Sequence, residues 1–192
     1  MWPQRLPREI QENPFRKAER DVYAKLASEL DEKWIVFYSR PWLGLNQSGE
    51  EVDGEADFIV AHPDRGLLAI EVKGGGIDWD PMLDRWTSTG ARGWVSVIKD
   101  PVAQARSAKH QIVKKLKESP HWKARWFRIR HGVIFPNCSV PNKALGPDRP
   151  RKLFCDTDEF KHSLGSWIEQ RFAVPDPEDP SSTGGGLDVD GR

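Results

Sequence analysis

The amino-acid sequence predicts one α/β (α+β) domain, with a mixed central sheet flanked by helices. Three observations lead to this fold class. Apolar patterns occur in the order helix, strand, strand, strand, helix, strand. Two Asx-Pro pairs mark helix starts, and a Pro-Asp-Arg-Gly sequence marks a turn between two of the strands. The 192 residues suffice for one medium domain with a substantial core.

The N-terminal part is expected to contain an arm, a helix, a strand and a loop. Residues 1–12 show little periodicity and form the arm. Asn13 is a favourable N-cap and Pro14 a favourable first residue for the helix. An apolar stripe continues this helix and comprises Phe15, Ala18, Val22, Leu26 and Leu30. Residues 34–38 form a buried strand, and residues 41–54 form a polar loop that contains glycine.

A β-hairpin is predicted next, because residues 56–61 and 67–72 are apolar runs on either side of a turn sequence. Proline, aspartate and glycine at 63, 64 and 66 are typical turn residues. A hairpin symmetric about Asp64 places Asp57 opposite Glu71, with Cβ atoms roughly 4.5–5.5 Å apart. A bulge in the turn would shift this register by one residue.

The remaining elements follow from the same signals. Residues 77–79 and 85–88 form a short hairpin, with a further strand at 94–98. Asp100-Pro101 starts a second helix, which carries an apolar stripe as far as Pro120. Residues 129–135 form a strand, and Asp156 with Glu159 forms a capping box for a last helix that ends at Phe172. The domain therefore spans residues 13–174, and the acidic, Pro- and Gly-rich residues 175–192 form a disordered tail or a linker.

Charge is balanced overall, with 29 basic and 29 acidic residues, but it is unevenly distributed. Residues 92–130 contain eleven Lys or Arg against two acids. Such a stretch suits an anionic partner, although a solvated helix face has the same composition. The nucleic-acid-binding candidates are the cations on the second helix: Arg106, Lys109, Lys114, Lys115 and Lys117.

Several classes of protein are excluded. Two cysteines, far apart at 138 and 155, support neither a disulfide framework nor a zinc site. The N-terminus lacks the apolar core of a signal peptide, and no apolar run is long enough to span a membrane. We therefore expect a soluble, cytoplasmic protein with no membrane partner; a homo-oligomer remains open.

Asp57, Glu71 and Lys73 share one face of the predicted hairpin, on which the other side chains are apolar. Two facing carboxylates repel each other and raise each other's pKa unless a cation lies between them. Mg²⁺, with Mn²⁺ as a substitute, accepts one or two carboxylates together with water and phosphate oxygens. Alternatively, Glu71 and Lys73 form an ordinary ion pair while Asp57 begins an edge strand.

The residues around this site resemble a known family. Glu55-Ala56-Asp57-Phe58-Ile59-Val60, the glycine turn and Ile70-Glu71-Val72-Lys73-Gly74 are similar to the nuclease-related domain (NERD) family of the PD-(D/E)XK nuclease superfamily. Trp86 and the helix start at Asp100-Pro101 extend the resemblance over residues 13–118. It implies a restriction-endonuclease-like αβββαβ core. The superfamily's proline before the aspartate is replaced by Ala56.

The resemblance also implies roles for single residues. Asp57 and Glu71 match the metal-binding acids, the Val72 carbonyl a metal ligand, and Lys73 the catalytic lysine. Glu19 matches an acid on the first helix, and Gln104 a polar residue on the helix after the core strands. From its own position on the apolar stripe, Glu19 either faces this site or extends to solvent at the helix start. Gln104 is equally compatible with a surface position.

The implied activity is that of a Mg²⁺-dependent deoxyribonuclease in DNA processing, repair or defence. The family resemblance, rather than any residue, favours DNA over RNA. No P-loop is present, so a superfamily 1 helicase or other ATP-driven partner would have to be another chain or a fused domain. Two alternatives remain: a non-catalytic DNA-binding or adaptor module, and a protein-interaction subunit of a defence or repair complex.

Overall fold

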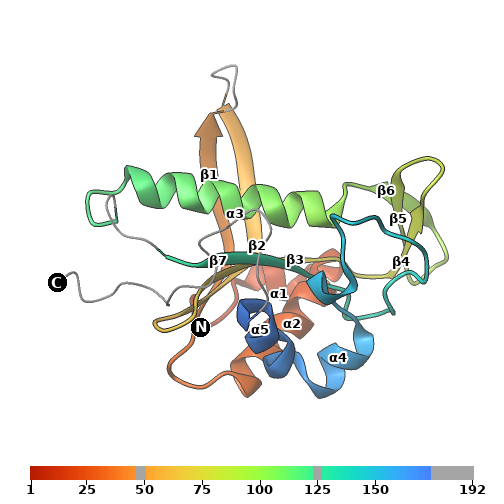
Figure 1. Cartoon of the computed structure of the whole chain (residues 1–192). Helices are drawn as coiled ribbons and strands as arrows, with labels where there is room; N and C mark the ends of the chain where they lie inside the picture. The colour runs from red at the N-terminus through yellow and green to blue at the C-terminus, as the bar shows by residue number, and fades with distance from the viewer. Residues whose placement is uncertain (46–50, 123–126, 174–192) are drawn as a thin grey trace.

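The structure is a computed structural model of the chain, and it describes residues 1–45, 51–122 and 127–173 (Figure 1). Its central sheet has five strands in the order β1-β2-β3-β7-β8. Strands β1 (Ile35–Leu45), β2 (Glu51–His62) and β3 (Gly66–Val72) are antiparallel, whereas β7 (Ile129–Ile134) and β8 (Phe154–Cys155) continue the sheet in parallel. The predicted α+β class with a mixed sheet is confirmed.

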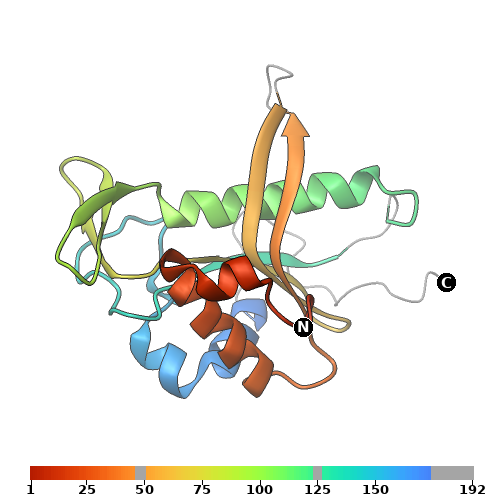
Figure 2. The same ribbon diagram turned by 180° about the vertical axis from the view of Figure 1, so that it is seen from behind.

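Helices cover both faces of this sheet (Figures 1 and 2). Helix α3 (Pro101–Glu118) crosses one face, in contact with β3 and β7. Helices α2 (Lys17–Glu29) and α5 (Leu164–Ala173) lie on the other face, together with α1 (Arg8–Glu12) and α4 (Thr157–His162). The sheet is therefore the middle of three layers, as expected when helices cover parallel strands.

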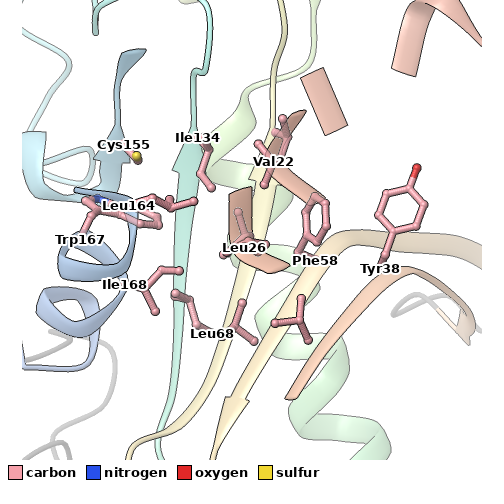
Figure 3. Close-up of a cluster of buried hydrophobic side chains, with 14 of the residues drawn as sticks. Val22, Leu26, Tyr38, Phe58, Leu68, Ile134, Cys155, Leu164, Trp167 and Ile168 are labelled. Atoms are coloured by element: carbon pink, nitrogen blue, oxygen red, sulfur yellow. The ribbon is translucent and has the colours of Figure 1, made fainter. Parts of the chain in front are cut away.

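The larger core lies between the sheet and the α2/α5 layer (Figure 3). Val22 and Leu26 of α2 are fully buried there against β2 and β3. A second cluster, between α3 and the opposite face, includes Ala69, Ala108 and Ile112. The predicted stripes of both helices therefore face the sheet, with one exception described below.

A separate three-stranded sheet lies at the N-terminal end of α3 (Figure 1). It consists of β4 (Gly76–Asp80), β5 (Arg85–Thr89) and β6 (Val95–Ile98), all antiparallel. Trp79 and Trp86 are buried between this sheet and Val102 of α3. The predicted short hairpin and the following strand are thus confirmed. Asp100 caps α3 as expected, accepting from the Val102 N–H at 2.8 Å.

The predicted register of the β2–β3 hairpin is confirmed. Phe58 lies opposite Ile70, and Val60 lies opposite Leu68, so the hairpin is symmetric about Asp64. Gly66 closes the turn with φ +107°, a conformation that residues with a side chain rarely adopt. A Cβ atom on Gly66 would also lie 2.1 Å from the Arg128 carbonyl oxygen. Both the backbone conformation and the lack of space for a side chain therefore require glycine at this position.

The loop predicted at residues 41–54 is wrong for most of its length. Strand β1 continues to Leu45 and strand β2 begins at Glu51, so the two strands form a long arm that extends beyond the rest of the sheet (Figure 1). Residues 46–50 lie outside the described part of the chain. The arm was missed because a two-stranded ribbon is held by its main-chain ladder and needs no apolar alternation, the signal on which the prediction relied.

The N-terminus also differs from the expectation. Pro14–Arg16 form a 3₁₀ turn, η1, and the α-helix begins only at Lys17, so Phe15 falls out of phase with the stripe and is 93% exposed. Residues 1–12 are not a free arm: Trp2 forms a β-bridge with Phe37, and Ile10 packs against the main core.

The C-terminal helix is interrupted. The capping box of Asp156 and Glu159 is present, but α4 ends at His162 and α5 begins at Leu164. The tail predicted at 175–192 lies outside the described residues. Across the described ranges, the structure contains no helix with both the length and the apolar character needed to cross a membrane.

Candidate active site

The candidate site lies where β2 and β3 separate. The last paired residues of their ladder are Phe58 and Ile70. Beyond this point β2 continues along β1 into the arm, whereas β3 continues beside β7, with the Lys73 N–H donating to the Ile134 carbonyl at 3.0 Å. The two strands thus diverge as a fork, and Asp57 and Glu71 are the first residues inside it.

Asp57 is held in the fork by the main chain of β3. Its Oδ2 accepts a hydrogen bond from the Val72 N–H at 2.7 Å. This N–H points toward β2, where the ladder has ended, so the carboxylate replaces a missing strand partner. The N–H and C=O of one strand residue point to the same side. The Val72 carbonyl is therefore directed into the fork with Asp57.

Glu71 and Lys73 form the other half of the fork. Glu71 is buried, with an exposed fraction of 4%, and its Oε1 lies 2.5 Å from the Lys73 Nζ. The Lys73 side chain is partly exposed, at 22%. Alternation along β3 explains the arrangement, because residues two apart point to the same face. One end of the lysine thus contacts a buried acid while its side chain still reaches solvent.

Both acids are destabilised in their charged form. Burial raises the pKa of Asp57 well above its usual value, and the carboxylates of Glu71 and Glu19 raise it further. The pKa of Glu71 is also raised, chiefly by burial, although the Lys73 ammonium opposes the shift. Glu19 and Glu55 add to the effect on Glu71. One lysine therefore does not neutralise the negative charge in the fork.

Glu19 reaches this site from α2 and does not extend to solvent. Its Oε2 accepts hydrogen bonds from the Tyr38 hydroxyl at 2.7 Å and from Arg16 Nη1 at 2.8 Å, and its side chain is 13% exposed. Burial and Glu19 together raise the pKa of the Tyr38 hydroxyl, which remains a donor. Of the two orientations that its stripe position allowed, the inward one is observed.

Four polar residues beside the fork were not assigned a role from the sequence: Arg16, Tyr38, Ser39 and Glu55. Glu55 accepts from the Ser39 hydroxyl and lies 4.0 Å from Arg16, which bonds Glu19. Ser39 has φ +46° on β1, at the point where β1 and β2 leave the sheet. The one available signal was Glu55 in the acid-x-Asp motif; nothing in the sequence brings Arg16 or Tyr38 to it. We refer to Glu19, Glu55, Asp57 and Glu71 as the acid cluster.

Gln104 is placed on the second turn of α3, where its Oε1 is buried and accepts no hydrogen bond from any described residue. An amide oxygen without a donor in a buried position is costly. Gln104 as a whole is half-buried. Its role at the site stays a prediction.

The predicted cationic face of α3 is divided. Lys114, Lys115 and Lys117 are exposed, as a nucleic-acid contact requires. Lys109 is instead buried, at 5%, and Arg106 is partly buried and lies 3.8 Å from Asp148. Only Lys109 was mistaken for a surface cation, because its burial depends on packing, which charge counting does not register.

The fork has a donor set that fits a hard divalent cation. Two carboxylates and one carbonyl supply oxygens, the ligand type of Mg²⁺. The raised pKa values of Asp57 and Glu71 indicate a surplus of negative charge that such an ion would relieve. Within the described ranges, no three His, Cys, Asp or Glu side chains form a complete metal cage. A site with few side-chain ligands is the usual arrangement for Mg²⁺, which keeps several waters.

The mixed sheet between helices is consistent with a nuclease-like core, and two acids and a lysine lie where two of its strands part. The sequence model of the nuclease-related domain (NERD) matches residues 15–136, and the chain belongs to this family. Comparison with curated proteins and with solved structures gave no match.

Proposed function

We propose that the protein is a metal-dependent nuclease that hydrolyses DNA phosphodiester bonds. One observation carries the proposal: the strand fork holds Asp57 and Glu71, both with raised pKa, beside a partly exposed Lys73. Buried carboxylates that repel each other are costly unless a ligand compensates, and perturbed acids of this kind gather at functional sites. Membership of the nuclease-related family supports the same chemistry.

Asp57, Glu71 and the Val72 carbonyl would hold Mg²⁺, or Mn²⁺ in its place. When bound, the ion supplies Lewis-acid chemistry, activating water and offsetting charge on the phosphate. The chain itself supplies positioning. The Val72 N–H fixes one Asp57 oxygen at 2.7 Å, and Tyr38 with Arg16 fixes Glu19. These bonds hold the acids in place before substrate arrives, which lowers the cost of binding.

Lys73 is the residue that would act on the reacting groups. Its Nζ is anchored on Glu71 at 2.5 Å and its side chain is open to solvent on one side. An ammonium in this position can orient the attacking water, accept its proton after losing its own, or stabilise charge on the phosphate. The exposed Lys114, Lys115 and Lys117 would attract the DNA backbone.

The biological setting is part of the proposal and rests on the family alone. The domain would act in DNA processing, repair or defence, with a helicase or another ATP-driven partner. The second candidate function, a non-catalytic DNA-binding or adaptor module, has the same exposed lysines in its favour. It differs in needing no metal at the fork.

Cleavage by the purified protein tests the proposal against this alternative. We expect wild-type protein to cut DNA with Mg²⁺ or Mn²⁺ and to stop when EDTA is added, whereas Glu71→Gln is inactive. A matched control is Glu169→Gln, which changes an exposed acid on α5 that pairs with Arg65 at 3.4 Å. DNA binding without cleavage under every metal condition would favour the adaptor function and contradict the nuclease.

A further inference from the structure

The 3₁₀ turn η1, Pro14–Arg16, borders the acid cluster and has features, beyond the bond that fixes Glu19, that the proposed hydrolysis does not use. Its last residue, Arg16, donates to Glu19 at 2.8 Å and lies 4.0 Å from Glu55. Its middle residue, Phe15, is 93% exposed. A solvent-exposed aromatic ring and an arginine that borders the acid cluster are therefore consecutive residues.

The turn is fixed in place. The Asn13 side chain accepts from the Phe15 N–H at 2.9 Å, and the Arg16 N–H donates to the Asn13 carbonyl at 3.1 Å. Arg20 of α2 donates to the carbonyls of Asn13 and, at 3.0 Å, Ile10. The outward position of Phe15 is thus set by hydrogen bonds on both sides of it, and no rearrangement is needed to present the ring.

Arg16 retains unused donors. Its Nη1 is bound to Glu19, whereas the described residues provide no acceptor for its Nε or Nη2, and its side chain is 32% exposed. The Glu19 bond raises the pKa of the guanidinium, which stays charged. A planar cation held by one edge and open at the other matches the geometry of a phosphate group.

We propose that Phe15 and Arg16 bind an unpaired nucleotide of the substrate beside the acid cluster, with its base stacked on Phe15 and its phosphate on Arg16. Stacking on exposed aromatic rings next to backbone-binding cations is how single-stranded nucleic acid is recognised. Bases inside a duplex are already stacked and cannot use Phe15. This inference rests on the proposed function, and it makes a single strand or a frayed end the preferred substrate.

The charge around Arg16 sets a condition on this binding. Glu19 and Glu55 lie beside it, and Asp57 and Glu71 lie farther into the fork. These acids repel a phosphate unless a divalent cation offsets them. Binding through η1 should therefore require a divalent ion, whereas binding through the exposed lysines of α3 should not.

The test is binding of fluorescein-labelled oligonucleotides in Ca²⁺ by protein that carries Lys73→Met to prevent cleavage. Adding Phe15→Ala should weaken binding of single-stranded DNA by about 5- to 150-fold, equivalent to 1–3 kcal/mol of stacking, and leave blunt duplex unchanged. Adding Arg16→Gln should lower the single-strand salt slope by about 0.7. Arg16→Lys keeps a positive charge beside Glu19 but cannot make the planar contact with the phosphate. It therefore separates loss of the phosphate contact from disturbance of the fold.

Two control substitutions match these variants. Met82→Ala removes another exposed apolar side chain, at 90%, between β4 and β5. Arg65→Gln removes a part-exposed arginine with one acidic partner, Glu169, at the opposite end of the β2–β3 hairpin. Neither should alter single-strand binding. An RNA oligonucleotide of the same sequence shows whether the sugar matters.

Failure of this inference differs from failure of the proposed function. If Phe15→Ala behaves as Met82→Ala does, or weakens duplex and single strand equally, the η1 site is overturned even when the wild type cuts DNA. If single-strand binding depends on Phe15 and the wild type never cuts, the η1 site stands and the nuclease is contradicted.

Discussion

At the scale of the residue, the central feature is that Asp57 and Glu71 have raised pKa values in the folded chain. A carboxyl with a raised pKa holds its proton more tightly in the folded state than in the unfolded state. The free energy of unfolding therefore falls as pH rises from the ordinary carboxyl values, 3.8 and 4.5, through the raised ones. Below the ordinary values the loss is absent, and it grows as the pH rises toward the raised values.

Neutralising one acid should consequently stabilise the metal-free protein. Asp57→Asn keeps an oxygen that can accept from the Val72 N–H but removes the charge. We expect thermal unfolding in EDTA at pH 7 to show a gain of about 0.5–2 kcal/mol, the usual range for a stabilising substitution. Mg²⁺ should stabilise the wild type and not this variant, because ligand binding to the folded state raises stability.

Asp64→Asn is the matched control, since Asp64 lies in the turn of the same hairpin and is 84% exposed. It should have little effect in EDTA or in Mg²⁺. A lower melting temperature for Asp57→Asn than for the wild type in EDTA would show that the aspartate is not destabilised by its surroundings, contrary to the raised pKa.

At the scale of the element, the β2–β3 hairpin positions the site, and its register depends on the turn. Gly66→Ala places a side chain at φ +107° and 2.1 Å from the Arg128 carbonyl oxygen. We expect a loss of at least about 1–3 kcal/mol in denaturant unfolding, from backbone strain and from displacement of neighbouring main chain.

Gly93→Ala separates these two causes. Gly93 also has positive φ, +78°, but a Cβ there would meet no atom within 4 Å. It should cost only the strain of the left-handed conformation. Equal losses for the two variants would mean that contact with Arg128 contributes nothing to the turn.

Helix α3 is the element expected to attract the DNA backbone. Replacing Lys114, Lys115 and Lys117 together with glutamine should weaken duplex binding and reduce the log–log salt slope by roughly 0.9 for each lost phosphate contact. Lys109→Gln changes a buried residue and should reduce stability instead. Measuring both DNA binding and unfolding for each variant distinguishes the exposed face of α3 from its buried face. An unchanged salt slope in the triple variant would mean that DNA binds elsewhere on the protein.

Particular elements show why sequence reasoning succeeded or failed. The turn chemistry at 62–66 was strong enough to predict the β2–β3 register, whose ladder ends one residue short of Asp57 and Glu71. Helical spacing gave an inward position as one of two orientations for Glu19, and this is the one observed. These features depend on local periodicity, which a sequence carries directly.

The failures depend on contacts between distant segments. Lys109 is charged, but packing of α3 against the sheet buries it. Phe15 does not lie on the apolar stripe of α2, because the 3₁₀ turn before the helix changes the angular position of its side chain. The bond from Tyr38 to Glu19 joins β1 to α2 and has no signature in either segment alone.

At the scale of the whole molecule, we propose different tasks for different parts of the chain. The fork between β2 and β3 would hold the metal and Lys73, α3 would attract the DNA backbone, and the η1 turn would select an unpaired nucleotide. The three lie on different elements around one sheet (Figures 1 and 2). Substitutions on α3 should therefore leave the other two tasks intact, whereas the fork and η1 are coupled through the bond from Arg16 to Glu19.

The most direct measurement compares Lys73→Met with the wild type in three assays on the same DNA: Mg²⁺ binding, DNA binding and single-turnover cleavage. If the fork is a nuclease site in which Lys73 acts on the reacting groups, both binding constants should persist while turnover falls by about 10²- to 10⁴-fold. Metal affinity should hold or rise, because a cation has left the site. Cleavage within a few-fold of the wild type would contradict the account.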